Sequence, residues 1–383
     1  MPLSLRRDKL ALQYITKLKS NPANPTYDCV FNPKYPLLFD SRPHIIPTLG
    51  LRLKEKLDET GIQLHTIARF SYPTIPLWTI RSAIFVYDLH NIGKKADTQP
   101  DLYIAKYHEL QSILIDYTKI FTDGSKDGSL VAAAAVSIAT NLSSRLPDNA
   151  SIFSAEAYAI LLATDIIKSS AGSNFVIFSD SLSCLQAIQN RLWDNPIILN
   201  ILNSLHTLIT AGTSIIFVWL PSHVGIKGNS RADTAAKAAL SLQISKREVP
   251  HTDFKPLINS YLRTKWQHSW DLEVFNKLHA IKSHLGNTTF GSHLSRRDER
   301  VLHRLRIGHT HLTHAHLLKS EDQPECVTCQ SPLTVEHILL RCVDFNHLRP
   351  NYFIVASLYE LFDTVPPKFI LDFVKAIGLY HKF

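Results

Sequence analysis

Four acidic residues stand where the neighbouring sequence is mostly apolar. Asp123 and Asp180 each end an apolar run expected to be a β-strand, and Glu156 and Asp233 fall in the expected first turns of two helices. Each alone has an ordinary explanation, since Asp often forms turns and acidic residues favour helix N-termini. Brought together, four carboxylates would repel one another unless cations neutralised them. Mg²⁺ prefers such oxygen ligands, and two ions can hold the attacking and leaving oxygens of a phosphodiester.

A histidine lies in a glycine-containing loop shortly before the last of these acids. His223 belongs to the loop 219–229, which leads into the helix of Asp233. Beside a carboxylate cluster, a loop histidine can shuttle protons or assist product release. The alternative is a capping or packing histidine, because the chain contains 19 of them.

Three of the five cysteines lie close together with a histidine between them, namely Cys326, Cys329, His337 and Cys342. The spacing suits a closed tetrahedral Zn²⁺ site, and four protein ligands leave no open position, which implies a structural ion. The step from His337 to Cys342 is slightly wide for one helix face. The alternative is three free thiols near a chance histidine. The odd, sparse cysteine count is no disulfide framework and favours an intracellular protein, nuclear or cytoplasmic and not secreted.

Local patterns predict the elements that position these residues. Strands followed by alternating helices indicate an α/β sheet with helices on its faces. Asp123 and Asp180 would share one sheet end if their strands are parallel and adjacent. Ser151 or Ser154 is expected to cap the first helix. The expected strands span 117–123, 129–139, 174–180 and 213–220, with a short strand after the second, and the helices span 152–169, 181–191, 195–211 and 230–243.

The flanking regions are expected to be mainly helical, and they carry the excess positive charge. The net charge is +8, whereas residues 115–245 hold 8 basic and 9 acidic residues. Basic flanks suit a polyanion such as nucleic acid, although this excess is also ordinary scatter. The composition, 45% hydrophobic and 19% charged, is typical of a globular protein. No apolar run reaches the roughly 18–20 residues of a membrane helix, and the N-terminus has no secretory signal pattern.

Several strings occur in one order over about residues 116–243: F-T-D-G-S, S-A-E-A-Y-A, F-S-D-S and W-L-P-S-H-V-G-I-K-G-N-S-R-A-D. As a set they resemble the type 1 ribonuclease H family, in the version found in non-LTR retrotransposon polyproteins. The resemblance implies a ribonuclease H-like fold with a five-stranded mixed sheet flanked by helices. It implies a mobile loop histidine at His223. The implied ligands of the two catalytic Mg²⁺ ions are Asp123, Glu156, Asp180 and Asp233.

Two positions depart from the pattern of that family. Ser222 stands where Gly is usual in the retroelement versions, and Ser230 stands where Glu is usual. Neither departure removes a metal ligand. Ser222 could alter the flexibility of the loop, because Gly reaches backbone angles that Ser avoids.

The remaining segments resemble other parts of the same polyproteins. The cysteine motif resembles their C-terminal zinc-binding segment, and residues 1–66 resemble the thumb-side end of a reverse transcriptase. The paired-aspartate signature of a polymerase is not found in the sequence. The expected division is a thumb-like helical remnant at 1–66, a connection at 67–115, a ribonuclease H domain at 116–245, and a basic helical region with the zinc-binding segment at 246–383.

Three functional hypotheses follow. In all of them the partner is a nucleic acid, and none involves a membrane. The first is a Mg²⁺-dependent endonuclease that hydrolyses the RNA strand of RNA–DNA hybrids by a two-metal mechanism, with recognition through backbone shape and the 2′-hydroxyl. The second is a catalytically inert nucleic-acid-binding remnant of a decayed retroelement, against which the complete carboxylate set argues. The third is a transposase or integrase nuclease, which generally uses three acids and leaves the His223 loop unexplained.

Overall fold

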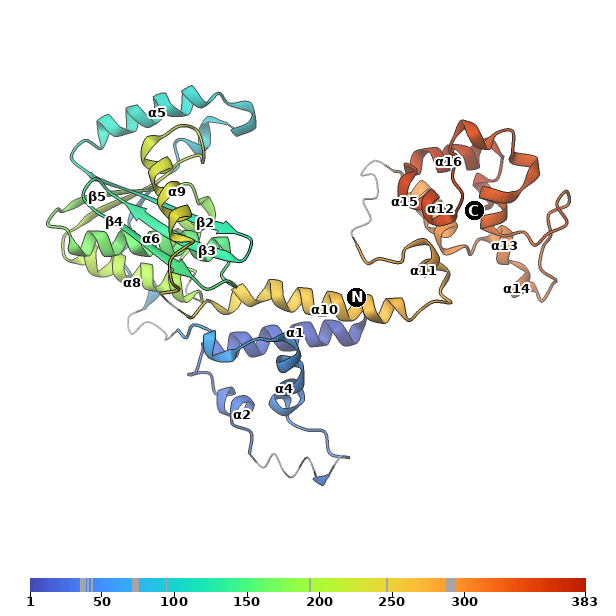
Figure 1. The fold of residues 1–383 in the computed structure, drawn as a ribbon, viewed down its shortest axis with the longest axis horizontal. Coiled ribbons are helices and arrows are strands. Elements are labelled where there is room, and N and C mark those ends of the chain that lie inside the picture. Colours follow the sequence, from blue (N-terminus) through green and yellow to red (C-terminus); the bar gives the residue numbers. More distant parts are fainter. Residues whose placement is uncertain are drawn as a thin grey trace. The chain divides into compact units, whose positions relative to one another are not determined.

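The chain divides into two compact units, which are described separately. The computed structural model describes residues 1–34, 39, 41–42, 44–70, 76–93, 95–192, 194–245, 247–286 and 294–383. One unit is Arg6–Asn259, and the other combines Met1–Leu5 with Ser260–Phe383 (Figure 1). Among the described helices, none is long and apolar enough to cross a membrane.

The Arg6–Asn259 unit is built on a six-stranded mixed sheet in the order β1-β6-β5-β2-β3-β4. Neighbours among β2, β3 and β4 pair antiparallel, and the other pairs are parallel. This arrangement confirms the expected α/β sheet. The strands are β1 (Ile84–Val86), β2 (Thr118–Asp127), β3 (Leu130–Val136), β4 (Asn141–Leu146), β5 (Asn174–Ser179) and β6 (Ser214–Trp219).

The predicted number of five strands is wrong, because β1 adds a sixth beside β6. β1 comes from the segment 67–115, which the sequence presents as a connection. Only three of its residues pair with β6, from Ile84 opposite Ile216 to Val86 opposite Val218. So short a strand shows no alternation of apolar and polar residues by which it could be recognised.

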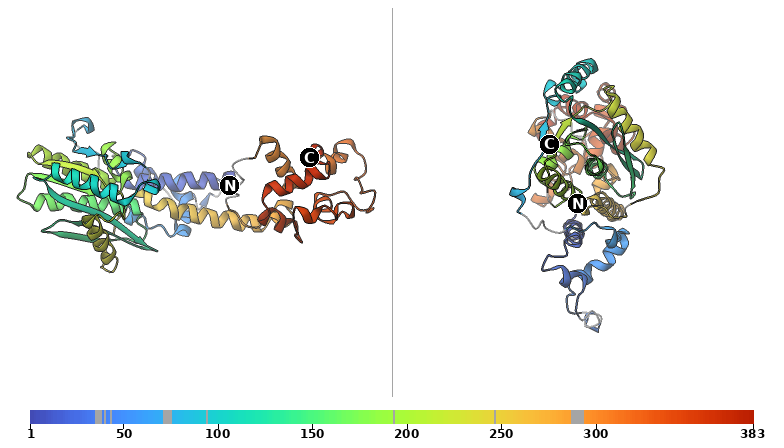
Figure 2. Two further views of the ribbon diagram at one scale, coloured as in Figure 1. Left: turned by 90° about the horizontal axis from the view of Figure 1, so that it is seen from above. Right: turned by 90° about the vertical axis from the view of Figure 1, so that its left-hand side faces the viewer.

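Helices cover both faces of the sheet (Figure 2). Successive residues of β5 face opposite ways: Phe175 and Ile177 pack with α6, α7 and α8, whereas Val176 and Phe178 pack with α5 and α9. This alternation is the period of a strand buried on both faces. The helices are α5 (Pro100–Ile113), α6 (Ile152–Ser169), α7 (Leu182–Gln189), α8 (Pro196–Thr210) and α9 (Lys227–Ala239).

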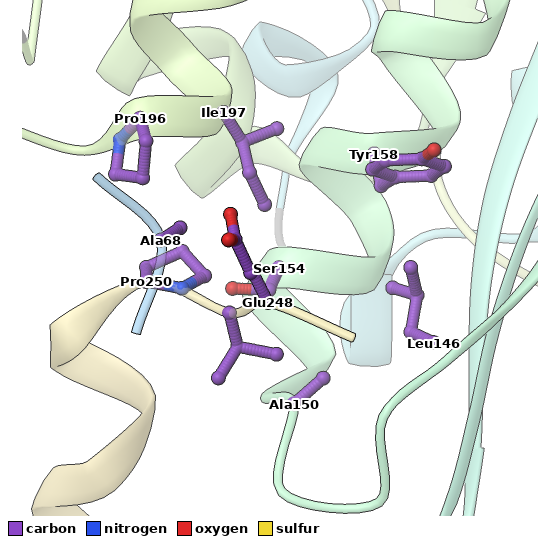
Figure 3. A pocket seen from close by; sticks show the side chains of 10 residues that line it. Ala68, Leu146, Ala150, Ser154, Tyr158, Pro196, Ile197, Glu248 and Pro250 are labelled. Atoms are coloured by element: carbon purple, nitrogen blue, oxygen red, sulfur yellow. The ribbon is translucent and has the colours of Figure 1, made fainter. Parts of the chain in front are cut away.

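Two segments outside the sheet, one before β1 and one after β6, are joined by backbone hydrogen bonds. The backbone N–H of Ala68 donates to the carbonyl of Val249 at 2.8 Å, and Val249 N–H donates to Thr66 O at 2.9 Å. Pro250 and Ala68 line a small cavity with Ser154 of α6 and Glu248, and none of the four candidate acids is among its lining residues (Figure 3). The remaining elements here are α1 (Leu3–Ser20), which begins in the other unit, α2 (Tyr27–Phe31), α4 (Leu49–Thr60), and the 3-10 turns η1 (Leu64–Thr66), η2 (Leu77–Thr79), η3 (His90–Ile92), η4 (Lys95–Asp97) and η5 (His251–Phe254).

The second unit is mainly helical, as expected. Its core gathers Leu302 and Leu305 of α12, Leu339, and Phe373 and Val374 of α16, all fully buried. Its elements are α10 (Lys255–Asp271), which begins in the first unit, α11 (Lys277–Ile281), α12 (Arg296–Ile307), α13 (His311–His314), α14 (His316–Lys319), α15 (Leu358–Thr364), α16 (Pro367–Ala376), the π-helical turn η6 (His337–Arg341), and the 3-10 turns η7 (Val343–Phe345), η8 (Arg349–Asn351) and η9 (Tyr380–Lys382).

Candidate active site and metal centre

The pairing of β2 with β5 places two of the acids side by side. The strands are parallel, and Thr122 lies opposite Ser179 at the end of their register. The next residue of each chain is Asp123 and Asp180, respectively. The condition set by the sequence, parallel and adjacent strands, is therefore met.

Glu156 reaches this sheet end from α6. A Cβ on Gly124 would lie 2.7 Å from the backbone nitrogen of Glu156, so only glycine allows β2 to approach the helix this closely. Candidate ligand atoms of Asp123, Glu156 and Asp180 all lie within 4.8 Å of one another. The expected position of Glu156 in the first helical turn is wrong: α6 begins at Ile152, which places Glu156 in the second turn, beyond the strongest influence of the helix dipole.

Asp233 lies next to these three acids but is not part of the group whose ligand atoms lie within 4.8 Å of one another. It too lies in the second turn rather than the expected first, because α9 begins at Lys227 instead of residue 230. Its carboxylate accepts a hydrogen bond from Nζ of Lys237 at 2.8 Å. The early part of α9 packs against β2, where a Cβ on Gly228 would collide with the ring of Phe121. The structure thus brings three of the four acids together and places the fourth beside them.

The carboxyl groups are buried with little compensation. The pKa of Asp123 is raised to about 8, first by burial and then by the charges of Asp180 and Asp233. Burial also raises the pKa of Glu156 well above its ordinary value, and its buried Oε2 has no hydrogen-bond partner among the described residues. Three carboxyl groups whose oxygens converge, one of them with a buried unpartnered oxygen, form the donor set that a hard cation requires. The residues present therefore fit Mg²⁺.

Two neighbours that sequence reasoning missed hold Asp180 in place. Nδ2 of Asn229 donates to Oδ2 of Asp180 at 3.4 Å and opposes the rise in its pKa that burial causes. Nε1 of Trp219 donates to the backbone carbonyl of Asp180 at 3.0 Å. Both residues belong to the string W-L-P-S-H-V-G-I-K-G-N around His223, and their place in that string could have identified them as neighbours of the site.

His223 lies exposed on the loop between β6 and α9, and its charge lowers the pKa of Asp180. The backbone of His223 itself is left-handed, with φ of 54°. Ser222 has no such angle. Ser222 therefore does not use the backbone region that glycine favours.

The four residues of the cysteine motif converge in the second unit. Their candidate ligand atoms lie within 4.8 Å of one another. Sγ of Cys342 lies 3.8 Å from Sγ of Cys326 and 3.9 Å from Sγ of Cys329. A tetrahedral ion with Zn–S distances of about 2.3 Å places its sulfurs about 3.8 Å apart. Nε2 of His337 is buried and has no hydrogen-bond partner among the described residues. The donor set therefore fits Zn²⁺.

Local backbone geometry explains this convergence. The N–H of Cys342 donates to the carbonyl of His337 at 2.7 Å, which closes a π-helical turn. Such a turn accommodates the five-residue step that is wide for an α-helix. At the other end of the motif, Gln330 adopts a left-handed φ of 48° and donates its N–H to Cys326 O. The backbone N–H of Cys329, together with His337, lowers the pKa of the Cys326 thiol to about 6, which favours the thiolate that binds metal. Burial raises the pKa of the neighbouring Cys342 thiol to about 11, so that thiol depends on the ion for its deprotonation.

Comparison with known proteins bears on the first of these sites. Residues 116–241 match the family model of RNase H. This match covers about a third of the chain, and it supports a ribonuclease H enzyme with the ribonuclease H-like fold. A similar solved structure is the RNase H1 of the halophilic archaeon Halobacterium salinarum NRC-1, with 19% identity, a TM-score of 0.27, and coverage of 32% of this chain and 97% of that chain. No curated protein matches the chain.

Proposed function

We propose that the protein is a Mg²⁺-dependent endonuclease that hydrolyses the RNA strand of RNA–DNA hybrids. The observation that carries this proposal is the convergence of Asp123, Glu156 and Asp180 at one sheet end, with Asp233 beside them. The RNase H match over residues 116–241 supports it. Substrate choice would rest on backbone shape and the 2′-hydroxyl rather than on base edges.

The acidic residues would hold two Mg²⁺ ions, one at Asp123, Glu156 and Asp180 and the second with the help of Asp233. Bound there, Mg²⁺ supplies Lewis-acid activation of water and neutralises charge at the scissile phosphate. The amide of Asn229 orients the carboxylate of Asp180 by donating to it. The products would carry 3′-hydroxyl and 5′-phosphate ends.

His223 is placed to handle protons at the edge of this site. Its exposed imidazole stands on a loop that Val224 and Ile226 anchor by burial. At that place the imidazole can take up or release a proton during turnover or assist the departure of the product.

We further propose that Cys326, Cys329, His337 and Cys342 hold one structural Zn²⁺. Four protein ligands leave no position for substrate. Because such a site exists only when the chain is folded, the ion would contribute directly to the stability of the unit that holds it.

The order of motifs leads us to propose an origin in a non-LTR retrotransposon polyprotein. The supporting features are the resemblance of residues 116–243 and the Cys-Cys-His-Cys motif to two segments of such polyproteins. Under this proposal residues 1–66 descend from a reverse transcriptase thumb, residues 67–115 connect it to the ribonuclease H domain at 116–245, and residues 246–383 form the zinc-binding region.

Cleavage of a hybrid with a labelled RNA strand tests the function. The full chain is expected to cut the RNA strand with Mg²⁺ and to leave duplex DNA intact. Asp180→Asn should lower the rate by at least about 100-fold, because it removes a buried metal ligand. Asp165→Asn is the matched control, since Asp165 is an exposed acid on α6 paired with Lys168. An intact RNA strand with Mg²⁺ and Zn²⁺ both present would reject the nuclease and favour the inert nucleic-acid-binding protein.

A further inference from the structure

The four acids are unequal in the partners they already have. Glu156 Oε2 is buried and without a hydrogen-bond partner among the described residues, whereas Asp233 is 23% exposed and accepts a bond from Lys237 at 2.8 Å. The three acids that converge within 4.8 Å exclude Asp233. The ammonium group of Lys237 is therefore paired with Asp233, the acid that lies outside the group of three.

This ion pair differs from an ordinary pair on a helix surface. Asp233 raises the pKa values of Asp123 and Asp180, so it belongs electrostatically to the buried group. The charge of Lys237 also reaches Asp123, whose pKa it lowers. Lys237 thus supplies positive charge to the same acids that a bound cation would neutralise. By contrast, Lys168 and Asp165 form a comparable pair at 2.9 Å on α6, and neither is a main cause of the pKa shifts of the clustered acids.

We propose that Lys237 competes with the cation that needs Asp233, so that the two cation positions of the site differ in affinity. This inference rests on the proposed Mg²⁺-dependent function. At the position formed by Asp123, Glu156 and Asp180, no Lys of the described residues forms an ion pair with a ligand, and Lys237 acts there only through its more distant charge on Asp123. At the other position the side chain of Lys237 must leave Asp233 first. Lys237 is in this sense a positioning residue that acts through Asp233.

The size of the effect follows from the nature of the pair. Exposed ion pairs are weak and screened by salt, so the competition costs a modest factor rather than abolishing binding. Repulsion between Lys237 and a divalent cation near Asp233 adds to that factor. Together they should weaken the second position about three- to tenfold. The weaker position would then fill only at higher Mg²⁺ concentration.

Counting bound ions tests this directly. We would titrate the full chain with Mg²⁺ by calorimetry and with Mn²⁺ by electron paramagnetic resonance, using wild type, Lys237→Met, Lys237→Arg and Lys168→Met. The wild type should show two phases of binding. Lys237→Met should tighten the weaker phase about three- to tenfold and leave the stronger phase within twofold. Lys237→Arg keeps the charge and should behave as wild type, as should the control Lys168→Met.

The outcomes separate the inference from the function beneath it. If Lys237→Met leaves the weaker phase unchanged, or tightens both phases equally, the competition is refuted while the Mg²⁺ site stands. If the wild type binds no divalent ion in either experiment, the proposed function and this inference fall together. A helix-stabilising role alone would change the melting temperature of Lys237→Met without changing its ion affinities.

Discussion

The buried carboxyl group of Asp123 favours the binding of a cation, but its charge lowers the stability of the folded chain when no cation is bound. It is 7% exposed, and its acidic neighbours add to the effect of burial on its pKa. Uncompensated charge of this kind is a cost that a bound cation relieves. The sequence located these acids because strand ends and a helix stripe are local patterns. The ion pair of Asp233 with Lys237 follows the i,i+4 spacing of one helix, a local pattern that the sequence reasoning overlooked.

The pKa of Asp123 predicts a stability change with a definite sign. Its folded pKa of about 8 exceeds the ordinary 3.8, so stability is fully present below about pH 4 and is lost as pH rises toward 8. Asp123→Asn should therefore be more stable than wild type by about 1–3 kcal/mol at pH 8 and similar at pH 4. Chemical denaturation of both proteins in Mg²⁺-free buffer that retains Zn²⁺ measures this.

The same denaturation experiment can include two controls. Adding Mg²⁺ should shrink the advantage of Asp123→Asn, because only the wild type keeps the full ligand set. Asp165→Asn alters an exposed acid and should show no pH-dependent difference from wild type. An advantage of Asp123→Asn that falls with rising pH would contradict the assigned direction of the pKa.

At the scale of elements, α6 is held by residues far from it in the chain. Oδ2 of Asp253 accepts the backbone N–H of Ser151 at 3.1 Å, and Oδ1 accepts the Ser151 hydroxyl at 2.9 Å. Ser151 is the N-cap of α6, whose second turn carries Glu156. The chain that follows the sheet thus fixes the start of a helix that the site depends on.

Asp253→Ala is expected to destabilise the Arg6–Asn259 unit by about 1–3 kcal/mol, because it leaves buried donors of Ser151 without their acceptor. Asp253→Asn keeps one acceptor oxygen and should lose less. Thermal unfolding of the full chain followed by circular dichroism gives the comparison, with Asp165→Ala as an exposed control. A loss no larger than that of the control would show that Ser151 alone caps α6.

Helix boundaries show which elements could be predicted. α6 begins and ends at the predicted residues because Ser151 supplies a cap, and α8 begins at Pro196 after its cap, Asn195. The start of α9 was missed: Ile226 is no capping residue, and Gly228 usually disfavours a helix. Contact with the Phe121 ring overrides that preference. The backbone hydrogen bonds of Val249 with Thr66 and Ala68 join residues far apart in the sequence, so no local sequence pattern predicts them.

At the scale of the whole molecule, each unit has a core of its own. The two sides of the sheet form the cores of the first, and the second gathers helices around Leu302, Leu305 and Phe373. The proposed Mg²⁺ ligands all belong to the first unit and the proposed Zn²⁺ ligands all belong to the second. The effects of the two metals should therefore be separable.

Removal of Zn²⁺ should loosen the second unit alone. A Zn²⁺-selective chelator in buffer with excess Mg²⁺ is expected to abolish protection from hydrogen exchange around residues 326–342 and to spare residues 116–241. Cys342→Ser should reproduce this loss, whereas Cys29→Ser, which alters an exposed lone cysteine, should not. Exchange followed by mass spectrometry locates the effect. Equal loss of protection in both segments would contradict the independence of the two units.

The π-helical turn at His337–Arg341 limits how this segment can change in length. In an α-helix each residue advances about 100°, so a five-residue step points a side chain about 140° away from the first. The wider turn reduces that angular offset and lets His337 and Cys342 face one centre. Deleting one residue between them would leave a four-residue step, which a regular α-helix places about 40° apart on one face. Inserting one residue would make a six-residue step, about 120° from the same face in an α-helix. This short stretch should therefore tolerate the loss of one residue better than the gain of one.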